Sequence, residues 1–294
     1  MSRFLYPIVY IVAFLFALLP FRVLFFISDA LYFVIYYLIR YRRKLVKKNL
    51  SNAFPGKTPD EIRKIEKKFF RHFCDYFVET VKILHICDSE IKKRFVFKNL
   101  DTVQHYLDAG RPIVLYLGHY GNWEWVPSIT LHLKTNPHFI CGQVYRPLKN
   151  KTSDRFFLNL RKRFHSIGFT KHDVFRDIVR LRKEKINWII GFMSDQKPSG
   201  NQIPYPVVFL NQETPVLTGT EKIARHTQAA VCYIDILCKK RGYYEGTFLV
   251  LADNATETSE FEITEKYFRC LEQTILRNPS GYLWTHNRWR LKTK

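Results

Sequence analysis

Hydrophobic and polar positions change their spacing twice along the chain, which divides the sequence into three stretches. Residues 4–39 are almost continuously apolar, with Arg22 and Asp29 as the charged interruptions. Residues 58–86 place apolar side chains at intervals of three and four, which is typical of an amphipathic helix. From residue 112 onward, short apolar runs alternate with helical patterns, as expected for an α/β domain.

The amino-terminal apolar stretch predicts membrane association, although neither uncharged run reaches the roughly 20 residues of a full span. It fits one tilted transmembrane helix, a hairpin or re-entrant pair hinged at Pro20, or two helices lying in the membrane interface. The alternative is an aromatic-rich helical cap packed on the domain. A cleaved signal peptide is disfavoured because a second apolar run follows directly. We therefore expect residues 1–40 to be a membrane anchor and residues 41–294 to form the main domain.

Basic residues crowd the carboxyl-terminal flank of this stretch. The sequence RYRRKLVKK at 40–48 carries six Lys and Arg, whereas Arg3 is the basic side chain on the other flank. The positive-inside rule then leaves the residues after 40 in the cytoplasm. Each Lys or Arg held near an anionic leaflet contributes about 1 kcal/mol of attachment, and less at high salt.

The remaining pattern predicts a mixed, mostly parallel sheet flanked by helices, so the fold class is α/β. Thr58, Pro59 and Glu61 are an N-terminal capping signature for the helix at 58–86. We expect strands at 112–119, 138–145, 187–193 and 230–240, the last continuing through a hairpin, and helices at 152–167, 173–185, 218–228 and 258–277. The loop at 194–206 is rich in turn residues and is a candidate rim of an active site.

The chain is strongly basic, with 47 Lys and Arg against 26 Asp and Glu and a formal charge of +21. This surplus implies an anionic partner, which is nucleic acid, an acidic membrane surface, or an acidic carrier or substrate. RNP-like, zinc-finger and helix-turn-helix signatures are absent, which disfavours nucleic acid. The six cysteines form no C-x-x-C pair or metal-ligand spacing, so we expect reduced thiols and no bound metal.

The candidate chemistry lies in LYLGHYGNWEW at 115–125. His119 ends a buried strand, where open α/β sheets bind their ligands. Glu124 follows five residues later, which on a continuous helix would turn it about 140° away from His119. We therefore expect the chain to turn at Gly121 and Asn122, so that the Glu124 carboxylate orients the imidazole as a base. The alternative is an ordinary histidine with Glu124 as a solvated helix residue.

No G-x-S-x-G nucleophile motif accompanies this pair. The nucleophile must then come from the substrate, which describes a hydroxyl activated for acyl transfer. General-base assistance of this kind contributes about 10² to 10⁴ in rate.

GHYGNWE resembles the H-x-x-x-x-[DE] signature of the lysophospholipid acyltransferase superfamily, in the form typical of the late acyltransferases of lipid A biosynthesis. The similarity extends over nearly the whole chain, through YRPLKNKTSDRFFLNLR (145–161), MSDQ (193–196), TGTEKIARHTQAAV (218–231) and PSGYLWTHNRWR (279–290). The resemblance implies that His119 is the base and Glu124 its orienting partner. It further implies that Arg146 stabilises the thioester carbonyl or an acceptor phosphate, and that the substrate-binding block includes Asn150, Asp154, Arg161 and Asp195.

The resemblance also implies partners and a location. The family takes its acyl chain from acyl carrier protein and works without a cofactor at the cytoplasmic side of the bacterial inner membrane. The acceptor is then a hydroxyl of a lipid A precursor or of another membrane glycolipid, lysophospholipid or aminolipid. The alternative from a different class is a non-catalytic basic protein that binds an anionic membrane or nucleic acid.

Overall fold

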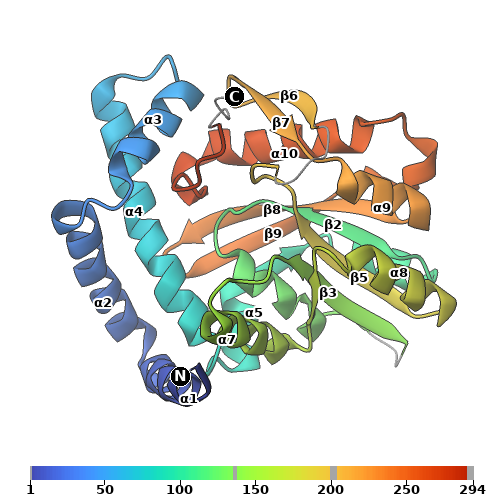
Figure 1. Ribbon diagram of the computed structural model, residues 1–294, viewed down its shortest axis with the longest axis horizontal. Helices are drawn as coiled ribbons and strands as arrows, with labels where there is room; N and C mark the ends of the chain where they lie inside the picture. The colour runs from blue at the N-terminus through green and yellow to red at the C-terminus, as the bar shows by residue number, and fades with distance from the viewer. Residues whose placement is uncertain (1, 135–137, 199–203, 290–294) are drawn as a thin grey trace.

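A seven-stranded mixed sheet forms the centre of the protein in a computed structural model that describes residues 2–134, 138–198 and 204–289 (Figure 1). The strand order is β1-β9-β8-β2-β5-β3-β4, and all neighbours are parallel except the antiparallel pair β8 and β9. The predicted fold class is confirmed. The sheet consists of β1 (Phe95–Lys98), β2 (Ile113–Leu117), β3 (Phe139–Tyr145), β4 (Ile167–Thr170), β5 (Asn187–Met193), β8 (Ala230–Lys240) and β9 (Tyr243–Ala252).

The strands predicted from continuous apolar runs are all present, including the β8–β9 hairpin. Four shorter strands escaped prediction. Two of these are β1 and β4, at the edges of the main sheet, and the others form a separate antiparallel hairpin, β6 (Tyr205–Phe209) and β7 (Gln212–Val216).

The predicted helices are present, although the one expected at 152–167 ends at Arg161. The long helix α4 (Pro59–Lys82) begins with the expected capping box: the Thr58 hydroxyl accepts from the Glu61 backbone, and the Glu61 carboxylate accepts from the Thr58 backbone at 2.8 Å. The others are α3 (Arg43–Ala53), α5 (Asp88–Arg94), α6 (Leu100–Asp108), α7 (Lys151–Arg161), α8 (Val174–Lys183), α9 (Gly219–Thr227) and α10 (Glu262–Arg277), with 3₁₀ segments η2 (Trp123–Leu131), η3 (Lys162–Phe164), η4 (Ala255–Glu257) and η5 (Pro279–Gly281).

Strand β2 lies between β8 and β5 and is buried along its length. Because side chains alternate along a strand, its two faces contact different helical layers. Tyr116 stacks on Tyr267 of α10, with ring centroids 4.5 Å apart. Leu115 and Leu117 point the other way and line a crevice beneath η2. The carboxyl end of β2 is therefore fixed from both sides.

The amino-terminal stretch folds into α1 (Ser2–Leu18), α2 (Phe21–Phe33) and a π-helical turn, η1 (Val34–Leu38), with the break at Pro20. The helices pack along α4 on the outside of the molecule (Figure 1). Residues 21–38 are long and apolar enough to cross a membrane, with a mean hydropathy of 1.6 and 22% of the segment buried. Large apolar side chains such as Phe26 remain exposed on this layer.

Polar contacts attach the same helices to the rest of the fold. The Ser28 hydroxyl donates to Asp75 of α4 at 2.6 Å, and the Lys82 ammonium donates to the carbonyl of Ala17 at 2.7 Å. Asp29, one of the two charges that interrupt the apolar stretch, pairs with Arg241 in the β8–β9 turn at 2.8 Å.

Candidate active site

The register of two parallel strands brings His119 to Asp195. Leu117 at the end of β2 lies opposite Met193 at the end of β5, and each candidate residue follows two positions later. The His119 Nδ1 atom lies 2.7 Å from Asp195 Oδ1, and the His119 backbone N–H donates to Oδ2 at 3.1 Å. The imidazole and its own backbone therefore hold both oxygens of one carboxylate.

Asp195 is an ionised acceptor despite its burial. Its surface is 1% exposed, and burial by itself disfavours the charged form. The nearby His119 and the hydrogen bonds outweigh that effect, so the pKa of Asp195 is lowered from its usual value. An ionised carboxylate on Nδ1 fixes the tautomer in which Nδ1 carries the proton. Nε2 then keeps a lone pair, and it lies 3.0 Å from the amide nitrogen of Gln196, which donates to it.

Glu124 has a different partner from the one expected. Arg161 Nε and Nη2 donate to its carboxylate at 3.0 and 2.7 Å in a two-pronged ion pair between η2 and α7. The expected His119–Glu124 contact is replaced by the His119–Asp195 contact. Successive residues of a 3₁₀ turn project about 120° apart. Because Trp123 packs edge-on against the imidazole at 5.2 Å between centroids, Glu124 is directed elsewhere.

The remaining predicted residues lie around α7. Asn150 caps this helix by accepting from the backbone of Thr152 and Ser153, and Asp154 accepts from the Leu148 backbone at 2.7 Å. Both therefore have a structural use in folding the loop after β3. Arg146 is exposed one residue past the end of β3, a neighbour of β5, so it lies at the same edge of the sheet as Asp195.

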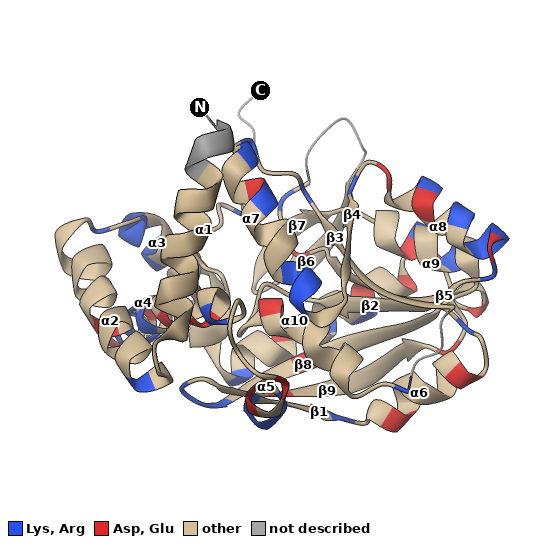
Figure 2. Ribbon diagram, turned by 90° about the horizontal axis from the view of Figure 1, so that it is seen from below, with Lys and Arg blue, Asp and Glu red and all other residues tan. Residues whose placement is uncertain are grey.

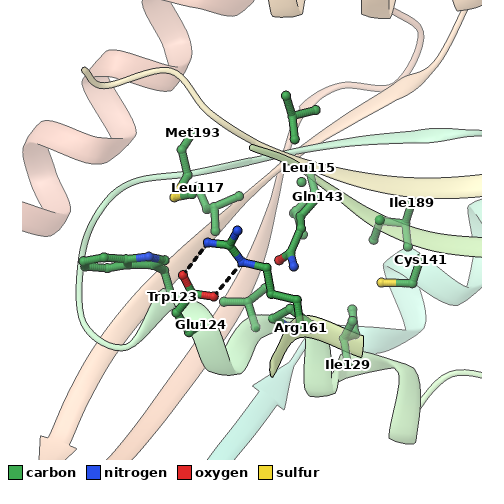
Figure 3. Close-up of a pocket in the computed structure, with 15 residues that line it drawn as sticks. Leu115, Leu117, Trp123, Glu124, Ile129, Cys141, Gln143, Arg161, Ile189 and Met193 are labelled. Carbon is green, nitrogen blue, oxygen red and sulfur yellow. Dashed lines mark hydrogen bonds and ion pairs between the residues drawn. The ribbon is translucent and has the colours of Figure 1, made fainter. Parts of the chain in front are cut away.

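An apolar crevice lies under the Glu124–Arg161 pair (Figure 3). Trp123, Leu117 and Met193 line one end, and Cys141, Ile189 and Ile129 line the other. Its cavity volume is about 30 Å³, room for about two water molecules. Since Trp123 also contacts His119, the crevice begins beside the imidazole.

Two supporting residues were not predicted. His286 Nε2 accepts from the Lys197 backbone at 3.1 Å, close behind Asp195, and burial lowers the pKa of His286 to about 4. Glu79 of α4 accepts from the Asn122 side chain at 2.9 Å and from the Tyr244 hydroxyl at 2.8 Å, and burial raises the pKa of Glu79 to about 8. His286 lies in one of the sequence blocks that resemble the family. For Glu79, nothing in the neighbouring sequence distinguishes it from the other acidic residues of α4.

Part of the expected rim, residues 199–203, lies outside the described residues, as does Arg290 of the terminal block. Within the described ranges, no group of three or more His, Cys, Asp and Glu side chains is arranged to hold a metal ion.

The fold and site define an α/β protein in which a buried carboxylate orients a histidine at the strand ends, beside an apolar crevice. Residues 1–291 match the family of bacterial lipid A biosynthesis acyltransferases, and the chain belongs to that family. The protein is therefore an acyltransferase, as the resemblance implied.

Two curated relatives span almost the same region. The lipid A biosynthesis palmitoleoyltransferase of Escherichia coli (strain K12) is 22% identical over 279 residues, which cover 93% of this chain and 87% of that protein. The lipid A biosynthesis acyltransferase of Shigella flexneri has the same identity and coverage.

Proposed function

We propose that the enzyme transfers a fatty acyl chain from an acyl carrier protein thioester to a hydroxyl of a lipid A precursor, with His119 as the general base. The observation that carries the proposal is the orientation of the imidazole. Buried Asp195 holds Nδ1, so Nε2 retains its lone pair beside an apolar crevice. The names of the relatives support a lipid A-type acceptor.

In the proposed reaction, the acceptor hydroxyl takes the place of Gln196 as the hydrogen-bond donor to Nε2. His119 removes the proton as the hydroxyl oxygen attacks the thioester carbon. The tetrahedral intermediate then expels the carrier thiolate, and the imidazolium returns the proton to that sulfur, giving an ester and a free thiol. Asp195 stabilises the imidazolium between these two steps. Arg146 supplies positive charge to the oxyanion or to an acceptor phosphate.

Glu124 and Arg161 have a different role in this scheme. The buried ion pair between Glu124 and Arg161 contains two hydrogen bonds and fixes α7 against η2. The same two side chains form the polar part of the crevice lining. The acyl chain enters along Leu117 and Met193, which requires the narrow crevice to widen. Glu124 is thus a positioning residue for the acyl site, and Asp195 takes over the orienting role first given to Glu124.

The proposal extends to the location of the enzyme. The exposed apolar faces of α1 and α2 support a membrane anchor at residues 1–40, followed by a catalytic domain at 41–294 on the cytoplasmic side of the inner membrane. The basic flank at 40–48 favours that orientation. The net charge of +21 favours docking of an acidic carrier protein, with no metal or cofactor in the reaction.

The test is His119→Ala in the full-length enzyme, with acyl carrier protein thioester as donor. We expect acyl transfer to a lipid A precursor to fall by about 10² to 10⁴, with membrane association retained, because the general base is lost. Mass spectrometry of the acylated lipid measures the rate. The matched control is His105→Ala, an exposed histidine on α6, which should leave the rate unchanged.

An unchanged rate in His119→Ala would contradict the assignment of the base. Transfer to a lysophospholipid or aminolipid in preference to the lipid A precursor would retain the base and replace the acceptor.

A further inference from the structure

A large cationic groove lies between the basic flank and the start of α4. Its volume is about 630 Å³. Two acidic and six basic side chains line it, an excess of four positive charges. The lining consists of Arg40, Arg42, Arg43, Lys44, Lys47, Arg63, Asp60 and Glu66, with Pro59. We call this set the cationic groove.

Little of this charge is neutralised within the described part of the chain. Arg43 pairs with the buried Glu66 at 2.9 Å, which cancels one cation. Lys44, Lys47 and Arg63 are exposed and form no hydrogen bond or ion pair among the described residues. Like charges gathered in one groove repel one another. The arrangement is therefore suited to an anion that enters from outside.

The backbone holds two of these arginines in an unusual conformation. Arg40 has a φ of 54° and Arg42 a φ of 50°, in the left-handed region where glycine would fit without strain. Each costs a non-glycine residue about 1–2 kcal/mol. The side chain of Arg40 donates to the Tyr37 carbonyl at 3.3 Å, and that of Arg42 donates to the Thr285 carbonyl at 2.9 Å. Such strain gathers at sites that position ligands.

The groove lies at the end of the apolar layer. Leu38 and Ile39, directly before it, are each 64% exposed. Figure 2 shows the Lys and Arg positions of α3 beside the mostly uncharged helix α2. A boundary between exposed apolar and cationic surface is where the headgroups of a bilayer lie.

We propose that the cationic groove binds the phosphomonoester headgroup of a membrane lipid. A phosphomonoester carries nearly two negative charges and three strong acceptor oxygens. Those oxygens suit the planar guanidinium groups of Arg40, Arg42 and Arg63 better than a single carboxylate would. The site is separate from His119 and does not depend on the catalytic proposal.

Helix α3 connects the groove to the catalytic edge. The Asn49 side chain donates to the carbonyls of Trp284 at 2.9 Å and His286 at 3.1 Å. A headgroup bound in the groove would therefore be linked to the loop that carries Asp195 through α3 and His286, which accepts from the Lys197 backbone.

The experiment titrates full-length protein in neutral detergent micelles with dioctanoyl phosphatidic acid and follows tryptophan fluorescence. The groove variant combines Lys44→Gln, Lys47→Gln and Arg63→Gln, none of which breaks a hydrogen bond or ion pair within the described part of the chain. We expect its affinity for phosphatidic acid to be about a hundredfold weaker, because three cations are lost and each cation near a phosphate contributes about a fivefold factor. Inorganic phosphate and dioctanoyl phosphatidylcholine should bind weakly or not at all.

The matched control combines Lys48→Gln, Lys64→Gln and Lys68→Gln, which lie on the same two helices outside the groove and change the net charge equally. It should bind phosphatidic acid nearly as the native protein does. An equal loss of affinity in both variants would contradict a specific site and indicate diffuse electrostatic attraction. Inorganic phosphate that binds as tightly as phosphatidic acid would show that the groove recognises free phosphate and not a lipid headgroup. His119→Ala should bind like the native protein, so this test fails or succeeds independently of catalysis.

Discussion

Asp195 and Glu124 are two buried carboxylates near the carboxyl ends of β5 and β2, and they bind different partners. Asp195 lies after β5 and holds the imidazole of His119, while Glu124 is close to His119 in sequence and holds Arg161. The partner of the histidine is thus separated from it by 76 positions, and the nearer carboxylate serves another element. The contrast shows that strand register, rather than sequence proximity, decides which carboxylate contacts the imidazole.

The largest effect is expected from Asp195→Asn. The amide keeps the size of the side chain but cannot hold an imidazolium, so kcat should fall by about 10³ to 10⁴ with little change in KM. Steady-state kinetics at saturating donor measures both. If kcat stays within a few-fold of native, the orienting role belongs elsewhere, and Glu124 would return as the candidate.

A smaller effect, on stability, is expected from Glu124→Gln. Arg161 would remain buried without a charged partner, which costs about 3–5 kcal/mol. Thermal unfolding should therefore occur at a clearly lower temperature. The control is the double change Glu124→Leu with Arg161→Met, which removes both charges and should recover most of the lost stability.

The same variants sharpen the comparison. If Glu124→Gln lowers kcat as strongly as Asp195→Asn while its unfolding temperature is unchanged, the division of roles between the two carboxylates is wrong.

The smallest effect concerns Glu79, another buried carboxyl group, which forms no ion pair with any residue that the structure describes. Its folded-state pKa of about 8 lies above the usual 4.5, so the folded protein binds a proton that the unfolded chain releases between these values. This contribution to stability is complete below pH 4.5, falls as pH rises through 8, and then levels off. Glu79→Gln should remove that slope, match the native protein below pH 4.5, and become more stable than the native protein as pH rises toward 8. Unfolding free energies at several pH values, giving the same slope in both proteins, would refute this reading.

Local patterns predicted much of the fold. The capping box of α4 and the apolar runs of β2, β5 and β8 depend on neighbouring residues, and all appear where expected. The four strands that were missed have four or five residues each, too few for a clear alternation. A hinge at Pro20 was one of the alternatives for the apolar stretch, and the structure breaks there into two helices.

The sequence predicted candidate residues for the site but not the contacts between them. His119, Asp195, Glu124 and Arg161 were all identified, yet their pairing depends on β5 lying next to β2, and that strand order is absent from any local window. Glu79 was missed because a buried acid in an amphipathic helix looks like its solvated neighbours until the turn at Asn122 is placed against it.

The attachment of the apolar layer has a mechanical consequence. Arg241 forms ion pairs with both Asp29 and Asp75, and Lys82 donates hydrogen bonds to the carbonyls of residues 17 and 19, just before Pro20. These contacts fix the first two helices to the rest of the fold. With the anchor proposed above, the position of the enzyme relative to the membrane is fixed. The fold therefore sets the height of His119 above the lipid surface. An enzyme held at one height would select acceptor lipids by the depth at which their reactive hydroxyl lies in the membrane.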